Sequence, residues 1–127
     1  MTDKETKFAC LISDTTLHFD FPYGDVSANL CIRKSPRWGN DVILSVSKGQ
    51  FLCKYDGCSV RVRFDKNAVA TYSVLEPSDN STTSLFVQGF DKFVSRTRKA
   101  DVTIIEAEFY QSGWHQMVFE TSGLKWP

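Results

Sequence analysis

The stretch DVILSVSKGQFLCKYDGCSVRVRFD, residues 41–65, decides which fold class the chain can adopt. Its first and last runs alternate with a period of two, which is typical of strands that have one face in a core and one face in water. The apolar sides of the two runs hold Val42, Leu44, Val46, Val60, Val62 and Phe64. Lys48-Gly49 and Asp56-Gly57 are turn dipeptides. The stretch therefore predicts a β-meander of three strand-like runs, from which a larger sheet can grow.

Length and composition bound the architecture and the function classes. The 127 residues correspond to one domain, 1–127, with 1–6 expected to form a flexible terminus. Ten Phe, three Trp and four Tyr in a chain that is 42% apolar can supply one hydrophobic core. Lys plus Arg equals Asp plus Glu at 15 each, and this zero net charge argues against a nucleic-acid partner, which a basic excess would favour. No apolar run reaches the roughly 18 residues that span a bilayer.

The remaining runs extend the β pattern and add one helix. Short strands are predicted at 7–13, 17–21, 28–34, 68–75, 84–88 (or a lead-in to the helix), 101–110 and 114–120. Residues 90–100 form the helix candidate, because Phe90, Phe93 and Val94 share one helical stripe. The sequence thus predicts a mainly β fold: an antiparallel β-sandwich or barrel-like domain of about eight strands with one short α-helix.

Four cysteines in a small β-rich chain favour disulfides, and the pair Cys53 and Cys58 brackets the turn KYDG. A four-residue loop would place the two face to face and permit a bridge, whereas a tight turn at Asp56-Gly57 would leave them diagonal and the bridge strained or absent. We predict the Cys53–Cys58 disulfide. Cys10 and Cys31 are candidates for a second bridge across neighbouring strands, which the sequence leaves open. The spacing lacks the second Cys or His pair of a zinc site, so neither a metal nor another cofactor is predicted.

The loop SPRWGN, residues 35–40, is the candidate binding surface. Pro36 bars a central strand position and Gly39 marks a turn, so Arg37 and Trp38 are expected on a loop. Trp and Arg are enriched at the energetic centres of protein interfaces. A partner-binding role is therefore predicted for Arg37 and Trp38; the alternative is that Trp38 folds back as a lid on the core.

Catalytic signatures are missing from the sequence. It holds no Gly-rich phosphate loop, no GxSxG, no HExxH and no calcium-loop motif. Glu106 and Glu108 could be interpreted as the two catalytic carboxylates of a glycosidase, but they are better explained as an exposed strand face opposite Arg61 and Arg63. The pattern gives no reason to bring a cysteine beside either histidine. The protein is therefore predicted not to be an enzyme.

Several segments together resemble a known group of proteins. GQFLCKYDGCSVRVRFD, SLFVQGFDKFV, IIEAEFY and the terminal VFETSGLKW are similar to segments of small Gram-negative envelope proteins, including lipoprotein-like proteins of prophage and island regions. They are more weakly similar to the VasI/TagO-like accessory proteins encoded with type VI secretion systems. The resemblance implies an exported, periplasmic or envelope-associated β-sandwich-like domain and carries over no active site. The polar start MTDKETKF fits a cytosolic protein and equally a mature exported domain.

The function expected from the sequence is a non-catalytic, envelope-associated binding or accessory module with an unidentified protein partner. One alternative is an oligonucleotide-binding barrel, in which Arg61, Arg63, Tyr72 and Trp38 would supply phosphate contacts and stacking. The other is a small enzyme of unrecognised type.

Overall fold

The computed structural model describes residues 7–14, 16–18, 24–36, 39–53, 57–77, 81–110 and 112–124, except for the side chain of His18. The strands in these residues are β1 (Lys7–Ile12), β2 (Leu17–His18), β3 (Asp25–Val26), β4 (Ala28–Ser35), β5 (Gly39–Val46), β6 (Cys58–Phe64), β7 (Ala70–Leu75), β8 (Ser84–Val87), β9 (Thr103–Phe109) and β10 (Gly113–Phe119). The helices are α1 (Phe90–Lys99) and the 3-10 helix η1 (Thr121–Gly123). No helix in this part of the chain is long and apolar enough to cross a membrane. The terminus 1–6, which was expected to be flexible, lies outside the described residues.

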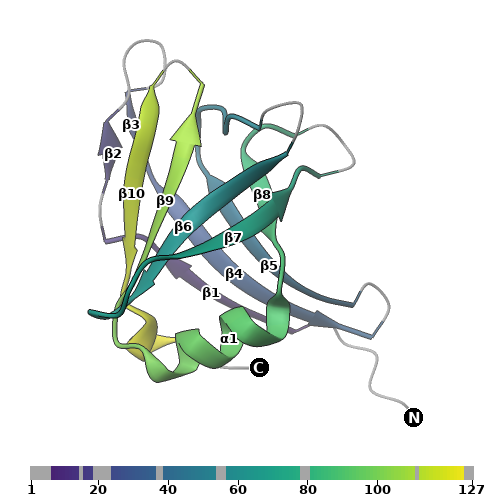
Figure 1. Cartoon of the computed structure of the whole chain (residues 1–127). Helices are drawn as coiled ribbons and strands as arrows, with labels where there is room; N and C mark the ends of the chain where they lie inside the picture. Colours follow the sequence, from purple (N-terminus) through teal and green to yellow (C-terminus); the bar gives the residue numbers. More distant parts are fainter. Residues whose placement is uncertain are drawn as a thin grey trace.

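Eight of the strands form one antiparallel sheet that curls into a half-barrel (Figure 1). Their order across the sheet is β1-β4-β5-β8-β7-β6-β9-β10, and β2 pairs with β3 in a separate ribbon. This ribbon lies beside β10 (Figure 1), and the Asp14 amide, between β1 and β2, donates to the Val118 carbonyl at 2.8 Å. α1 crosses one end of the half-barrel (Figure 1). The predicted mainly β, barrel-like fold with one short helix is confirmed.

The core fills the concave side of the sheet. Every second side chain of the long strands is buried, because successive side chains of a strand point to opposite faces. The alternation predicted from the sequence is confirmed for β5, β6 and β9. Burial of each Val, Leu, Ile, Met or Phe contributes about 1.5–3 kcal/mol. Fully buried strand residues include Leu30, Ile32, Val42, Leu44, Val60, Val62, Ile105, Phe109, Met117 and Phe119.

The predicted meander at 41–65 is wrong. β8 and β7 lie between β5 and β6, so these two strands are not neighbours. The described residues of the middle run, 50–53, form no strand; Phe51 makes one isolated bridge to Phe109, at the end of β9. A period of two fixes which face of a strand is buried but does not choose its hydrogen-bonded partner. Here β5 pairs with β8, for example Leu44 with Leu85, and the connection from β5 crosses to the other side of the half-barrel.

The helix α1 carries the predicted apolar stripe. Phe93, Val94 and Thr97 are buried, and Phe90 is half-buried. Gly89 precedes the helix with φ of +77°, in the left-handed region that glycine adopts without steric cost. The Phe93 amide donates to the Gly89 carbonyl at 2.9 Å, which closes the first turn.

Two polar contacts hold the segment that follows α1. The Asp65 carboxylate, in the turn after β6, accepts hydrogen bonds from the amides of Asp101 and Val102, both at 3.0 Å. The buried Thr121 hydroxyl donates to the Ala100 carbonyl at 2.9 Å. These contacts fix how α1 sits across the end of the half-barrel, and therefore where its charged side chains point.

Candidate functional site

The outer faces of β6, β9 and β10 bring together polar and aromatic side chains that point away from the core. The strand register places Arg61 of β6 opposite Glu106 of β9, and Trp114 of β10 opposite Glu108 of β9. Because the core takes the inward positions of these strands, the four side chains share the solvent side of the sheet. The expected opposition of arginines on β6 and glutamates on β9 is confirmed for Arg61 and Glu106, and it is wrong for Arg63, which lies opposite Ile104.

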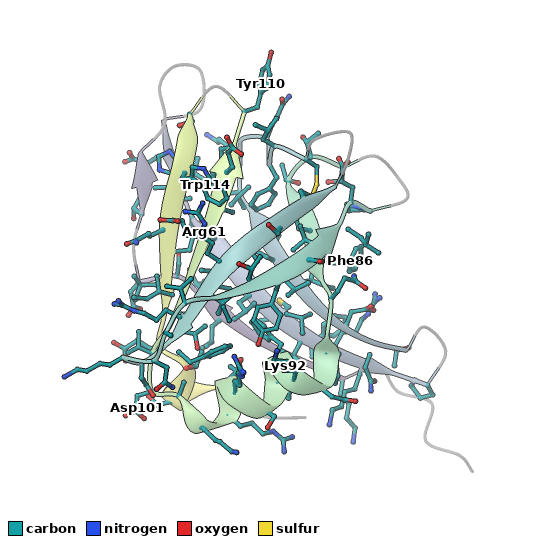
Figure 2. The ribbon with its side chains drawn as sticks, viewed as in Figure 1. Arg61, Phe86, Lys92, Asp101, Tyr110 and Trp114 are labelled. Carbon is teal, nitrogen blue, oxygen red and sulfur yellow. A yellow bond between two sulfur atoms is a disulfide. The ribbon has the colours of Figure 1, made fainter. Side chains whose placement is uncertain are left out.

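Arg61 links an aromatic and an acidic side chain. Its guanidinium carbon lies 4.2 Å from the centroid of the Trp114 ring, and one guanidinium nitrogen lies 3.0 Å from a Glu106 carboxylate oxygen (Figure 2). A cation over an exposed Trp contributes about 0.5–1 kcal/mol, and an exposed ion pair about 0.2–1 kcal/mol. Trp114 nevertheless remains 41% exposed. The Arg61 guanidinium thus covers part of the Trp114 ring without burying it.

Tyr110 adds a second exposed aromatic side chain at the β9–β10 turn, where it projects from the end of the molecule (Figure 2). Its amide donates to the Gln50 carbonyl at 2.9 Å. Within the same turn, His115 Nε2 lies 2.8 Å from the Ser112 hydroxyl, and the His115 ring packs edge-on against Phe109. These contacts brace the turn, and they give His115 a structural role in it.

We call Arg61, Glu106, Tyr110 and Trp114 the tryptophan surface. Its chemistry suits binding, because it combines flat apolar area with a cation whose planar donors can pair with carboxylates. No group of three or more His, Cys, Asp or Glu side chains in the described part of the chain is arranged to hold a metal ion.

The residues that the sequence singled out for binding, Arg37 and Trp38, lie outside the described residues. On either side of them, Ser35 and Gly39 pair across the β4–β5 hairpin. Gly39 has φ of +85°, in the left-handed region that glycine adopts without steric cost. Ser35 ends β4 and Gly39 begins β5, so the loop is shorter than the predicted 35–40.

The four cysteines come together as two pairs. The sulfur atoms of Cys53 and Cys58 lie at bonding distance, as the hairpin spacing predicted, and so do those of Cys10 and Cys31. Cys10 and Cys31 are directly opposite each other on β1 and β4, a pairing that the sequence left open. The Cys53–Cys58 pair ties the end of the connection from β5 to the start of β6.

This connection also supports the tryptophan surface. The Leu52 amide donates to the Glu108 carbonyl at 2.9 Å, and the Gln50 carbonyl accepts from Tyr110. Segment 50–53 therefore pairs with the last part of β9, beyond the part that pairs with β6. The Cys53–Cys58 bridge fastens this segment next to the strand that carries Glu106 and Glu108.

The fold separates the residues that would have supplied phosphate contacts and base stacking in an oligonucleotide-binding barrel. Arg61 and Arg63 are exposed on the outer face of β6, whereas Tyr72 points inward and is only 5% exposed. The Tyr72 ring packs edge-to-face against Phe64 and Phe93. Tyr72 therefore cannot offer a ring face to a base beside those arginines.

A signal for Trp114 was present in the sequence. In the strand predicted at 114–120, His115, Met117 and Phe119 occupy alternate positions, and the structure buries Met117 and Phe119 on that face. This alternation leaves Trp114 on the solvent side, where a large aromatic side chain departs from the polar pattern. The sequence of the strand alone does not predict that Trp114 stacks with Arg61, because this contact depends on the order of β6, β9 and β10 in the sheet.

Comparison of the chain with protein-family models, with curated proteins and with solved structures finds no match. The resemblance to envelope proteins and to the VasI/TagO-like group therefore stays a prediction.

Proposed function

We propose that this protein is a non-catalytic binding module of the bacterial cell envelope that holds a protein partner against the tryptophan surface. The observation that carries the proposal is the exposed Trp114 ring, which is stacked with the Arg61 guanidinium 4.2 Å from its centroid.

The energetics of protein interfaces support this choice of surface. Trp, Tyr and Arg are the residue types most enriched among interface hot spots, and the tryptophan surface contains one of each. Ordering a side chain at an interface costs about 0.5–1.5 kcal/mol. Trp114 and Arg61 restrict each other's side-chain conformations in the unbound protein. A partner that packs on them therefore loses less free energy to side-chain ordering.

The cysteines support the placement in the envelope. Both cysteine pairs lie at disulfide distance, and none of the four cysteines is free. Disulfides persist in oxidising compartments such as the bacterial periplasm and are rare in the cytosol. A small domain that uses all of its cysteines in this way is typical of an exported protein.

Site-specific photocrosslinking tests the proposal. p-Benzoylphenylalanine is introduced at position 114 of the full chain in cells of the source organism, and the crosslinked products are analysed in the periplasmic and membrane fractions. The matched control is position 86, because Phe86 is an aromatic side chain on the outer face of β8, away from Trp114 (Figure 2). We expect a discrete protein adduct at position 114 that is missing at position 86. No adduct at 114, or the same adducts at both positions, would contradict the proposed surface.

A further inference from the structure

The solvent side of α1 concentrates positive charge. Lys92, Arg96, Arg98 and Lys99 are all exposed, and the ten residues of the helix contain only one carboxylate, Asp91. Lys92 and Arg96 are four residues apart, a spacing at which like charges destabilise a helix. Because the chain as a whole has zero net charge, this concentration is a local feature of one end of the half-barrel.

The sheet brings two more cations to the same end. Lys7 of β1 lies directly opposite Lys34 of β4, and like charges in directly opposite strand positions are destabilising. Lys34 lines a cavity of about 450 Å³ together with Arg98 and Lys99 of α1. The half-buried ring of Phe90 forms part of the apolar floor of this cavity.

Among the described residues, the acidic side chains near this end include Asp91, Asp65 and Asp101, against six cations. Asp91 borders the same cavity. Asp65 borders a second cavity, of about 380 Å³, with Arg96 and Lys99, but its carboxylate already accepts two backbone hydrogen bonds. Lys99 thus stands between two open hollows, and cations flank both of them.

We propose that this cationic end docks on a membrane surface that carries anionic phospholipid headgroups. The cationic end consists of Lys7, Lys34, Lys92, Arg96, Arg98 and Lys99. Each Lys or Arg near such a surface strengthens binding by electrostatic attraction to the headgroup phosphates. The cost of placing like charges together is recovered when those phosphates lie between them. The two cavities are open, bordered by cations and partly apolar, so they can accommodate headgroups that project from a flat membrane surface.

The docked orientation leaves the tryptophan surface accessible. α1 crosses one end of the half-barrel, whereas Tyr110 lies at the opposite end (Figure 2). Membrane docking through α1 would therefore present the β9–β10 turn away from the bilayer. This inference does not depend on the protein partner proposed above, since the two surfaces share no residue.

A single-stranded nucleic acid is the other polyanion that cations can attract. Proteins that bind it combine cations with exposed rings on which bases stack. In the described part of the chain, the rings beside α1 do not offer such faces, because Tyr72 and Phe93 are buried and Phe90 is half-buried. The charge at this end therefore favours headgroup phosphates over a nucleic acid.

Vesicle flotation with the full chain tests the inference. The probes are phosphatidylcholine vesicles with and without phosphatidylglycerol, at salt concentrations of about 50 and about 300 mM, which bracket strong and weak screening. We expect binding only to vesicles that contain phosphatidylglycerol, and loss of that binding at the higher salt. Lys99→Glu changes the local charge by two units and should weaken vesicle binding by about thirtyfold.

Two matched variants separate the site from net charge and from helix stability. Lys48→Glu makes the same change in net charge beyond the far end of β5, and it should leave vesicle binding unchanged. Lys34→Glu changes a residue of β4 and none of the helix, and it should weaken vesicle binding as Lys99→Glu does. Melting curves of Lys34→Glu and Lys99→Glu test whether both variants remain folded. Equal loss in Lys99→Glu and Lys48→Glu would overturn the proposal, as would equal binding to pure phosphatidylcholine. Full competition by inorganic phosphate at constant ionic strength, or tighter binding to single-stranded DNA, would overturn it as well.

Discussion

Replacing Phe93 by alanine removes the side chain that joins α1 to the sheet. Phe93 has no exposed surface, and its ring centroid lies 5.8 Å from that of Phe64 and 5.4 Å from that of Tyr72, both edge-to-face. Deleting a buried Phe costs about 3–5 kcal/mol, and an edge-to-face aromatic pair contributes about 0.5–1.5 kcal/mol beyond area burial. Because two such pairs are lost, we expect a loss of about 4–5 kcal/mol in the free energy of unfolding.

Urea denaturation and thermal melting measure this loss. In a domain of this size each kcal/mol lowers Tm by roughly 3–5 °C, so Phe93→Ala should melt roughly 12–25 °C below the wild type. The matched control is Phe90→Ala, which makes the same deletion in the same helix at a half-buried position. We expect it to cost less than half as much. If Phe93→Ala melts within about two degrees of the wild type, or if the two variants melt alike, the helix is not docked as the structure shows.

Three further predictions concern the turn after β6, the cysteines and the loop at 35–40. Asp65→Ala should lower the free energy of unfolding by about 2 kcal/mol, because two backbone amides lose their acceptor. Asp65 has φ of +53°, in the left-handed region, which Asn tolerates. Asp65→Asn also keeps an acceptor oxygen, so urea denaturation should show a clearly smaller loss. Protein never exposed to reductant should show no free thiol under denaturing conditions; four free thiols would contradict both disulfides. If the loop at 35–40, and not the tryptophan surface, holds the partner, Trp38→Ala should leave Tm nearly unchanged and weaken partner binding by about 2 kcal/mol, whereas a loss of about 3–5 kcal/mol in stability would assign Trp38 to the core.

Features governed by local periodicity could be predicted from the sequence. The buried faces of β5, β6 and β9 and the buried stripe of α1 follow from side-chain spacing within a few residues. The Cys53–Cys58 pair was accessible for a similar reason, since the two residues are only five positions apart in the sequence. Each of these features depends on residues that are close together in the sequence.

Features that depend on the order of strands could not be predicted. The alternation in 41–65 fits a meander and the observed crossover equally well, because both bury the same side chains. The contact between Arg61 and Trp114 needs β6 and β10 to flank β9, which nothing in either strand specifies. The cationic end could not be predicted for the same reason, since Lys34 and Arg98 line one cavity only because α1 crosses that end of the sheet.

The most direct test of the proposed function is the affinity of the Trp114→Ala variant for the protein captured by crosslinking at position 114. The ring is 41% exposed, and its loss removes one exposed cation–π contact of about 0.5–1 kcal/mol, so Tm should fall by only a few degrees. Titration should show binding weakened by about 2 kcal/mol or more, roughly thirtyfold, while Phe86→Ala binds like the wild type. An unchanged affinity in folded Trp114→Ala protein, or an equal loss in Phe86→Ala, would contradict the assignment of the tryptophan surface as the binding site.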